Sequence, residues 1–382
     1  RSLYPYQKTG GGQIRLGQVK ALERLGWNIT TVIPNHHLQE LTIEGNLIQI
    51  PFNKRYNQRF TSILERLGFY EDYLDKWTVN AFDYLKDKVR KGDIVFATSG
   101  GELGMIKLGS LLKNEVSCRF VVNFHDPLNY SLVNNQKLDN KFHISRENQE
   151  LNYLGNSDLI ITSSKVNQSS LLSKYPQLKE KIKNNYFGYV KKINIERDER
   201  SNSNKLRIAY VGNMGTLQKP EILYEVYKKM PDKKSIEIYF IGDISSYTPL
   251  QDISDSNVKF INFMPHDEFL DFMSENIDIG FVSLTSDYLG ACVPSKIYEY
   301  INLELPMIGA LPEGDGMEIV NDNGYGVACK YNDLDGLLVA IDKFTDRNYL
   351  NSIKQNLIND KELWNMRSRI KEVDFLLRGL VD

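Results

Sequence analysis

The sequence predicts an α/β protein built from two Rossmann-like, doubly wound domains. Short apolar and β-branched runs alternate with amphipathic helical stretches along the chain. Most of these runs lack a period of two, which is typical of parallel strands that helices cover on both faces. The rhythm breaks once, at the charged segment 191–205, which has no periodic apolar face. We therefore predict two parallel-sheet domains joined by a linker at that segment.

The N-terminal domain is expected to span residues 1–190. It opens with a glycine-rich loop at 9–13 and a helix at Gln13–Leu25 that ends at Gly26. Three consecutive glycines indicate special dihedral angles or close approach of a ligand, and a flexible turn is the alternative. The strands that we expect here are Ile29–Pro34, Leu47–Pro51, Asp93–Thr98, Arg119–Phe124 and Leu159–Thr162.

The C-terminal domain is expected to span residues 206–356. Its expected strands are Leu206–Gly212, Ile236–Gly242, Val258–Phe263, Ile277–Ser283, Met307–Ala310 and Gly326–Ala328. The last segment, 357–382, is helical by pattern. It either completes the second domain or crosses back to brace the first.

Composition excludes several classes of protein. The 382 residues carry 47 Lys+Arg against 49 Asp+Glu, and this balance does not favour a nucleic-acid partner. The three cysteines have no metal-ligand spacing, so they predict neither a zinc site nor a disulfide framework and favour the cytoplasm. No apolar run approaches the ~20 residues that span a bilayer, and no signal peptide is visible. Because the chain opens at Arg1, we expect a few native residues ahead of it.

The segment VPSKIYE, residues 293–299, is the most informative one. Ser295 is a natural N-cap, and the N–H groups of the first helical turn attract anions. Lys296 adds a positive charge there, and Glu299 lies one turn deeper on the same face. A carboxylate suits a diol, so the pair fits the diphosphate and ribose of a nucleotide. The alternative is an ordinary capped helix whose Lys and Glu are solvated.

A second candidate phosphate element is VGNMGTLQK, residues 211–219, directly after an expected strand. Gly212 and Gly215 permit close approach of backbone N–H groups to a phosphate, and Lys219 can pair with an anionic oxygen. The motif is neither GxGxxG nor a P-loop. A tight turn with a surface lysine is the alternative.

In the first domain, the motif HDP ends the expected strand Arg119–Phe124. Ligands of open α/β sheets bind beyond the carboxyl ends of strands, so His125 and Asp126 are candidates for contact with a sugar. Asp126 can instead orient the histidine or cap the next turn. The other histidines show no ligand spacing and are expected to be ordinary surface or loop residues; they are His36, His37, His143 and His266.

Two further patterns have simpler explanations. Asp333 and Asp335 mimic a DxD metal motif but precede a helix, so capping is the better interpretation. Segment 54–70 is a basic amphipathic helix by pattern. Such a helix can lie on a membrane surface, although a core-facing helix is the commoner explanation of its apolar stripe.

Taken together, these motifs resemble the GT-B glycosyltransferases and, within them, the retaining family 4 enzymes. The family's opening glycine-rich loop, helix and strand are similar to TGGGQIRLGQVKALERLGWNITTVIP, and its central histidine segment to HDP. Its last N-domain strand is similar to SDLIITSS, and its diphosphate loop to IAYVGNMGTLQKP. The closest match is VPSKIYEYINLELPMIGA, which resembles a variant written P-S-K-x-x-E-Y followed by a P-[IMV]-I strand.

The resemblance implies a GT-B architecture, two domains facing a cleft, and a role for each matching residue. Glu299 would hold the ribose, Met264 would meet the base through its backbone, and His125 would face the donor sugar. The diphosphate would contact Ser295, Lys296, Lys219 and the loop of Gly212, Asn213 and Gly215. Gly11 and Gly12 would lie where donor phosphate and acceptor meet, near Asp126. The implied catalytic residues are His125, Lys219, Lys296 and Glu299.

Three departures from the family pattern stand out. The family's first strand is missing ahead of the glycine loop. Asn213 replaces an arginine that many members carry after the first glycine of the diphosphate loop. Ala291 replaces the first of the family's two paired glutamates, which usually contacts the donor sugar. Either backbone N–H groups around Gly290–Val293 replace that contact, or the donor is unusual.

The function that the resemblance implies is metal-independent transfer of a sugar, with retention, from a nucleotide diphosphate sugar. A UDP-sugar is favoured as donor, and no cofactor is expected. The acceptor would be a saccharide or lipid-linked saccharide of surface polysaccharide synthesis, and the protein would be cytoplasmic or peripheral on the inner membrane face. The alternatives are a sugar-nucleotide epimerase or hydrolase on the same fold, and a non-catalytic nucleotide-sugar-binding subunit.

Overall fold

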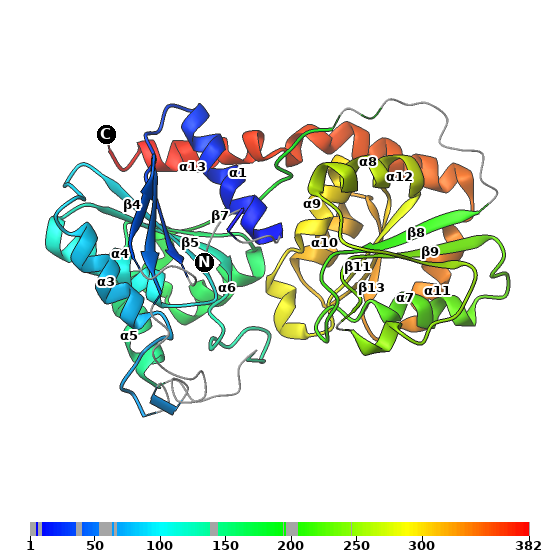
Figure 1. Ribbon diagram of the computed structural model, residues 1–382, viewed down its shortest axis with the longest axis horizontal. Coiled ribbons are helices and arrows are strands. Elements are labelled where there is room, and N and C mark those ends of the chain that lie inside the picture. The colour runs from blue at the N-terminus through cyan, green and yellow to red at the C-terminus, as the bar shows by residue number, and fades with distance from the viewer. Residues whose placement is uncertain are drawn as a thin grey trace. The chain divides into compact units, whose positions relative to one another are not determined.

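The structure is a computed structural model that describes residues 5–6, 10–35, 40–52, 63–64, 67–137, 144–193, 195, 205–245 and 247–381. The chain divides into two compact units, which are coloured along the chain in Figure 1. Unit 1 comprises Arg1–Phe187 and Arg369–Asp382, and unit 2 comprises Gly188–Ser368. Most of the expected linker 191–205 and of the expected basic helix 54–70 lies outside the described residues.

Unit 2 contains a six-stranded, entirely parallel sheet. Its strands follow the order β10-β9-β8-β11-β12-β13, which is the 3-2-1-4-5-6 order of a Rossmann sheet. Their bounds are β8 Leu206–Val211, β9 Ile236–Ile241, β10 Val258–Ile261, β11 Ile279–Ser283, β12 Met307–Leu311 and β13 Gly326–Lys330. Every expected strand of this domain is confirmed, with ends that shift by one or two residues.

Helices cover both faces of this sheet, with α8, α9 and α12 on one side and α7 and α11 on the other (Figure 1). The helices are α7 Glu221–Lys229, α8 His266–Asn276, α9 Ser295–Asn302, α10 Asp315–Asp322, α11 Leu334–Lys343 and α12 Arg347–Asp360. Short 3-10 turns lie at η2 Thr248–Leu250, η3 Asp287–Ala291 and η4 Lys361–Trp364. The capping role of Asp333 is confirmed, because its carboxylate accepts the Gly336 N–H at 2.9 Å.

The described residues of unit 1 form two sheets. A four-stranded parallel sheet has the order β4-β5-β6-β7, and a smaller sheet has the order β1-β3-β2. Their bounds are β1 Thr31–Asn35, β2 Thr42–Glu44, β3 Leu47–Pro51, β4 Ile94–Gly100, β5 Arg119–Asp126, β6 Leu159–Thr162 and β7 Ile182–Asn184. The sequence pattern did not indicate β2 or β7, because three residues are too few to show a period. Strand β2 is antiparallel to β3, an exception to the otherwise parallel pairing.

The helices of unit 1 are α1 Gly10–Arg24, α3 Asp75–Leu85, α4 Gly104–Val116, α5 Ile144–Asn156, α6 Lys165–Lys174 and α13 Met366–Arg378, with a 3-10 turn at η1 Pro176–Lys181. Helix α1 begins three residues earlier than expected. The run Gly10–Gly12 is therefore the first helical turn, and the expectation of an irregular glycine-rich loop is wrong for these residues.

The two units share one device at the amino ends of their central strands. In unit 2, Asp278 precedes β11 and its carboxylate accepts the backbone N–H of Arg207 on β8 at 3.0 Å and the guanidinium Nε at 3.1 Å. In unit 1, Asp158 precedes β6 and accepts the backbone N–H of Phe120 on β5 at 2.7 Å. Each aspartate also donates its own N–H to the carbonyl of the same partner residue. In each sheet, an aspartate carboxylate thus links the amino ends of two neighbouring strands.

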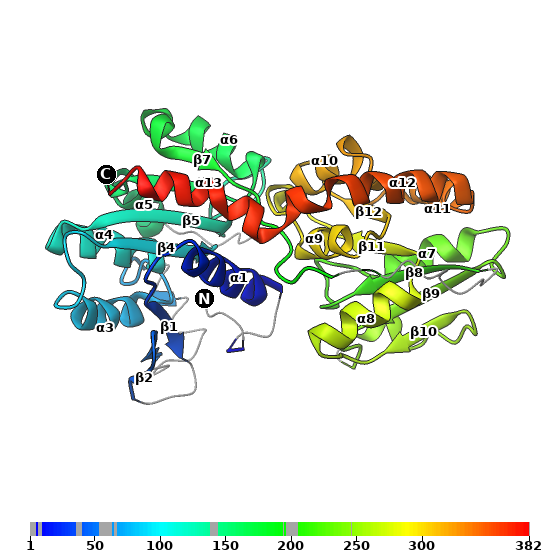
Figure 2. The same cartoon turned by 90° about the horizontal axis from the view of Figure 1, so that it is seen from above.

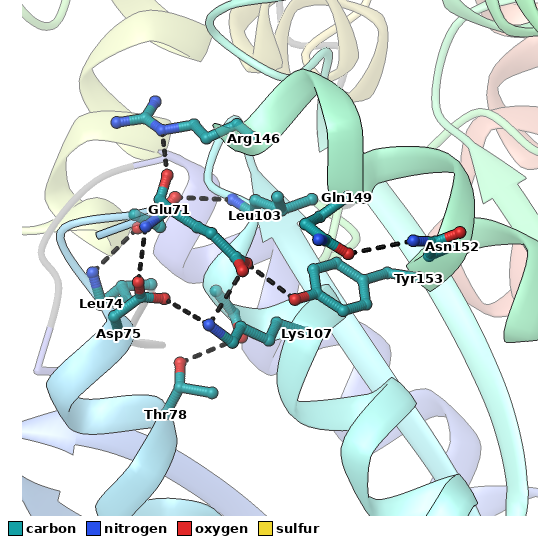
Figure 3. A network of polar contacts seen from close by, with 12 residues as sticks. Glu71, Leu74, Asp75, Thr78, Leu103, Lys107, Arg146, Gln149, Asn152 and Tyr153 are labelled. Carbon is teal, nitrogen blue, oxygen red and sulfur yellow. Dashed lines mark hydrogen bonds and ion pairs between the residues drawn. The ribbon is translucent and has the colours of Figure 1, made fainter. Parts of the chain in front are cut away.

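A polar network ties α3, α4 and α5 of unit 1 together, and Figure 3 shows it from close by. Lys107 on α4 lies between Glu71 and Asp75, with Nζ 3.2 Å from an oxygen of each carboxylate. Tyr153 on α5 donates its hydroxyl to Glu71 at 2.8 Å. Burial disfavours the charge of Lys107, but the two carboxylates outweigh burial and raise the pKa of its ammonium group.

The expectation of one helix through 357–380 is wrong. Helix α12 ends at Asp360, a 3-10 turn follows, and α13 starts at Met366. The break arises because Met366 donates its N–H to the carbonyl of Tyr189 at 2.9 Å, and Tyr189 donates back to Trp364 at 2.9 Å. An extended residue, Asn365, is needed between the helices to make these bonds.

Helix α13 packs on unit 1 beside α1, as both Figure 1 and Figure 2 show. Asp374 accepts the indole N–H of Trp27 at 2.7 Å, and Arg378 donates to the carbonyl of Leu25 at 2.8 Å. Helix α13 is therefore bonded to the residues that follow the end of α1. Among the described residues, every helix is too short or too polar to cross a membrane.

Candidate nucleotide site

The candidate site lies at the topological switch point of unit 2. Strands β8 and β11 are neighbours, but the chain leaves them toward opposite sides of the sheet order. Loops that follow such a pair of parallel strands diverge and leave a crevice at their carboxyl ends, where ligands of open α/β sheets bind. The two segments that the sequence analysis selected, 211–219 and 293–299, follow β8 and β11 respectively.

Glycine is required where these loops meet. Gly212 follows β8 with φ +102°, a conformation that other residues rarely adopt. A Cβ at Gly212 would lie 3.1 Å from Cε of Lys296, the second residue of α9. At the end of β9, a Cβ on Gly242 would lie 2.4 Å from the carbonyl oxygen of Gly212. The two predicted phosphate elements therefore come together at Gly212.

Lys296 is held by Tyr210, the fifth residue of β8. The ammonium group donates to the Tyr210 hydroxyl at 2.9 Å and lies 4.0 Å from the centroid of the tyrosine ring. Tyr210 in turn donates its hydroxyl to the carbonyl of Asn213 at 2.5 Å. The aromatic face provides a weakly negative surface for the cation, and the phenol connects that cation to the glycine loop. Sequence reasoning missed Tyr210, although its place two residues before Gly212 was a usable signal.

No carboxylate pairs with Lys296 within the part of the chain that the structure describes. Burial without a counter-charge lowers the pKa of this lysine to about 7. A bound anion would supply the missing charge and raise that pKa again. The site thus lacks a negative charge near Lys296, as a phosphate-binding site does when no phosphate is bound.

Glu299 lies one turn beyond Lys296 on α9, with a side chain that is 18% exposed. Its Oε1 is 3.4 Å from Nε2 of His266, the first residue of α8. Its Oε2 is buried and has no hydrogen-bond partner among the described residues. Buried carboxylate oxygens are normally satisfied, so an orphan oxygen one helical turn from Lys296 indicates a place for a donor from a ligand.

His266 is a second residue that sequence reasoning missed, because it was expected to be an ordinary surface or loop histidine. Burial alone would lower its pKa, but the hydrogen bond and the charge of Glu299 outweigh burial and raise the pKa of the imidazole. The available signal was position: His266 follows Met264 by two residues, and Met264 was already assigned to the nucleotide base. Met264 is half-buried in the turn between β10 and α8.

The start of α9 differs in one detail from the expected cap. Pro294 occupies the N-cap position and no side chain caps the helix, so Ser295 is the first helical residue and not the cap. The first N–H groups of a helix have no acceptor within the helix, and here no serine oxygen satisfies them. The N–H of Ile297 donates to the carbonyl of Pro294 at 3.0 Å. Those of Ser295 and Lys296 have no acceptor among the described residues and are available to a phosphate oxygen.

The neighbouring candidates have distinct positions. Gly290 and Ala291 are buried within η3, ahead of α9. Gly215 closes the turn after β8 by accepting the N–H groups of Gln218 at 3.0 Å and Lys219 at 2.8 Å. Lys219 is exposed and lines a cavity of about 300 Å³ together with Glu221, Glu225, Thr285 and Tyr331. The structure therefore places the Lys219 side chain in a cavity beside the glycine loop and not in contact with Lys296.

In unit 1, the histidine of the HDP motif, His125, is the last residue but one of strand β5 and is buried. His125 Nε2 lies 3.1 Å from the side-chain oxygen of Gln18 on α1, and the ring centroid lies 4.3 Å from that of Phe187. Asp126 is half-buried at the end of the same strand. Sequence reasoning missed Gln18, whose side chain reaches across from α1 to the strand.

Gly11 and Gly12 belong to the first turn of α1. A Cβ at Gly11 would lie 3.5 Å from Nη1 of Arg15, so this buried guanidinium lies over the first turn. Within the described residues, the structure contains no group of three or more His, Cys, Asp or Glu side chains that could hold a metal ion.

Known proteins are similar to this chain in structure but not in sequence. In sequence, no protein-family model and no curated protein matches the chain. In structure, it is similar to HepE (Alr3699) from Anabaena, solved with UDP and glucose, with a TM-score of 0.66, 14% identity and coverage of 99% of this chain and 98% of that chain. It is also similar to a UDP-forming α,α-trehalose-phosphate synthase from Burkholderia xenovorans, with a TM-score of 0.71, 10% identity and coverage of 100% and 98%.

A third similar structure is a glycosyltransferase from Rickettsia africae, with a TM-score of 0.65, 15% identity and coverage of 100% of this chain and 98% of that chain. These likenesses extend over both units and over nearly the full length of each protein. At such low identity they concern the fold, and they agree with the resemblance to family 4 enzymes. The chain therefore has the GT-B fold of the glycosyltransferases, with two Rossmann-like units.

Proposed function

We propose that this chain is a glycosyltransferase that moves a sugar from a nucleotide diphosphate sugar, a UDP-sugar being favoured, to a saccharide or lipid-linked saccharide. The observation that carries the proposal is the pairing, one turn apart on α9, of a half-buried lysine without a counter-charge and a glutamate with an orphan oxygen. A diphosphate fits the first and a ribose diol fits the second. One protein of similar fold, HepE, has been solved with UDP and glucose and with UDP-glucose.

The diphosphate would bind at the start of α9. Lys296 supplies charge, and the N–H groups of the first turn, beginning at Ser295, supply dipoles. The loop Gly212–Gly215 lets backbone N–H groups approach the same oxygens, and the exposed Lys219 can reach toward them. Asn213 presents its side chain to solvent at the position where many family members carry an arginine.

The nucleoside would lie along the face that Glu299 and Met264 share. Two vicinal hydroxyls of the ribose would donate to the Glu299 carboxylate, and the backbone near Met264 would contact the base. In unit 1 we propose contacts with donor sugar, donor phosphate and acceptor for His125, Asp126, Gly11 and Gly12. This assignment rests on the family resemblance and on the burial of His125 at the end of β5.

The reaction would break the bond between the anomeric carbon and the diphosphate oxygen and form a bond to the acceptor hydroxyl on the same face, with retention. The acceptor proton would pass to the departing phosphate oxygen. Lys296 and the helix N–H groups would stabilise the charge that grows on the diphosphate as the bond breaks. Since these groups occupy the role that a metal fills elsewhere, we propose a metal-independent reaction.

We also propose that the acceptor belongs to surface polysaccharide synthesis and that the protein works in the cytoplasm or peripherally on the inner membrane face. This rests on the resemblance to family 4 enzymes and on the basic apolar pattern of residues 54–70.

Replacing Glu299 with alanine tests the proposal. A hydrogen bond to a charged group contributes about 1.5–3 kcal/mol, so we expect Glu299→Ala to weaken UDP binding by about 10- to 150-fold. Isothermal titration with UDP measures this directly. As a matched control, Glu268→Ala on the exposed face of α8 should bind UDP like the wild type. Unchanged affinity in Glu299→Ala would contradict the ribose role.

The two alternatives separate in a turnover assay. An epimerase would alter the donor sugar without acceptor and without net release of nucleotide, whereas a transferase releases nucleotide only as the acceptor is glycosylated. A non-catalytic subunit would bind donor but need a partner protein for turnover. That second candidate is favoured by one observation: Ala291, which replaces a family glutamate, is fully buried and offers the donor no side-chain contact.

A further inference from the structure

We propose that His266 is a positioning residue that holds the Glu299 carboxylate for the ribose diol, and so sets the preference of this site for ribonucleotides. This inference rests on the proposed nucleotide site and adds to it a residue that the resemblance to family 4 enzymes does not supply. It begins from the contact between Nε2 of His266 and Oε1 of Glu299, at 3.4 Å.

The contact is asymmetric at the carboxylate. His266 is the partner of Oε1, while Oε2 is buried and has no partner among the described residues. A glutamate has three rotatable bonds and loses its orientation easily unless something fixes it. The imidazole therefore turns one oxygen toward α8 and leaves the other for a ligand. A carboxylate has about four acceptor positions, so a histidine and two hydroxyls can be accommodated together.

His266 is itself well fixed. It is the first residue of α8, and Pro265 before it has φ −55° and ψ 151°, which sets the entry of the chain into the helix. The imidazole is 29% exposed, and its centroid lies 6.0 Å from that of Phe269 one turn later. A ring anchored at a helix start and supported by an aromatic neighbour gives Glu299 a rigid partner.

The charges around the ring favour its protonated form. Glu299 from α9 and Asp267 from α8 attract the imidazolium, while Lys191 repels it and is partly neutralised by Asp267 at 2.7 Å. Burial opposes protonation, but the net result is a raised pKa. Below that pKa the contact is an ion pair, and above it only a neutral hydrogen bond remains. The hold on Glu299 should therefore weaken as pH rises through the raised pKa.

The test compares UDP with 2′-deoxy-UDP by isothermal titration in the wild type, His266→Ala and His266→Gln. Both ligands carry the same diphosphate, so the ratio of their affinities cancels the titration of the phosphate and of Lys296 and reports on the diol alone. We expect His266→Ala to lower UDP affinity about fivefold, the effect of one hydrogen bond, and 2′-deoxy-UDP affinity less than twofold. Glutamine can still donate to Glu299, so His266→Gln should recover much of the preference. Only the wild type should lose its preference for UDP over 2′-deoxy-UDP as pH rises, because neither variant has a titrating side chain at position 266.

Two outcomes would count against the inference. Equal loss of affinity for both nucleotides in His266→Ala would mean a general structural role, and unchanged affinity for both would mean that His266 does not hold the carboxylate for the diol. Thermal unfolding without ligand shows whether either variant is folded, and His266→Gln provides the test if the alanine variant is not. If the wild type binds neither nucleotide, the proposed function itself fails. If the wild type prefers UDP and His266→Ala keeps the same preference, only the inference about His266 fails.

Discussion

Replacing Lys296 with methionine should weaken ligand binding and strengthen the fold. Methionine keeps the length and the apolar stem of the side chain, so the contacts with Gly212 and with the Tyr210 ring persist while the charge is removed. A lysine placed for stability would produce the opposite result. The two signs together therefore separate a binding role from a structural one.

The magnitudes follow from the environment of the ammonium group. Burial lowers the pKa of Lys296 to about 7, whereas the unfolded chain keeps it near 10.4. Below the folded pKa the folded protein bears the full cost of the buried charge, and this cost disappears as pH rises from about 7 to about 10. Allowing for partial exposure, we expect Lys296→Met to stabilise the free protein by about 1–2 kcal/mol at pH 6 and by less at pH 9.

Affinity should change in the other direction. A charge-assisted hydrogen bond to a diphosphate is worth about 1.5–3 kcal/mol, so UDP-glucose should bind about 10- to 150-fold more weakly. In the wild type, binding must reprotonate Lys296 above its folded pKa, which predicts about tenfold weaker binding at pH 8 than at pH 6. The diphosphate diester of a nucleotide sugar keeps its charge over this range. Lys296→Met should remove most of this slope, and any remainder belongs to His266.

Differential scanning fluorimetry at pH 6 and pH 9 measures stability, and isothermal titration with UDP-glucose measures affinity. Lys259→Met, an exposed lysine on β10 of the same unit, is the matched control and should change neither quantity. A variant at Lys296 that unfolds more easily and binds UDP-glucose like the wild type would refute the reasoning.

Two further predictions concern stability. Asp278→Ala should cost about 3–5 kcal/mol, because it leaves the buried guanidinium of Arg207 unpaired, and chemical denaturation measures this. Because the pair lies at the amino end of β8, opposite the site, UDP affinity of the folded variant should be unchanged; a large loss would show coupling that we do not expect. Lys107→Met should cost about 1–3 kcal/mol by leaving the buried carboxylate of Asp75 and the half-buried one of Glu71 without their cation, and a neutral effect in denaturation would show that the network of Figure 3 is dispensable.

Much of unit 2 could be predicted from the sequence because its strands are continuous apolar runs bounded by glycines. Such runs identify buried parallel strands, and the position of a motif after a strand identifies the sheet edge where it lies. The convergence of segments 211–219 and 293–299 followed from that rule. What the rule could not supply was the order of the strands, which makes β8 and β11 neighbours and so brings the two segments to one crevice.

Side-chain partners across elements were beyond sequence reasoning. His266 and Glu299 are separated by 33 positions, and only the tertiary fold brings these two side chains on α8 and α9 together. The break at Asn365 was hidden because the residues on both sides keep a helical period, while the interruption comes from bonds to the distant Tyr189. The glycine run was misjudged for a related reason: glycine is permitted in a loop and equally in a first helical turn.

The central claim is that a nucleoside diphosphate binds unit 2 with its phosphates on the first turn of α9 and its ribose on Glu299. A crystal structure of the protein soaked with UDP tests it most directly. We predict phosphate oxygens within hydrogen-bond distance of Lys296 and both ribose hydroxyls on the Glu299 carboxylate. UDP bound elsewhere, with Lys296 still against Tyr210 and the Glu299 oxygen still orphaned, would contradict the account.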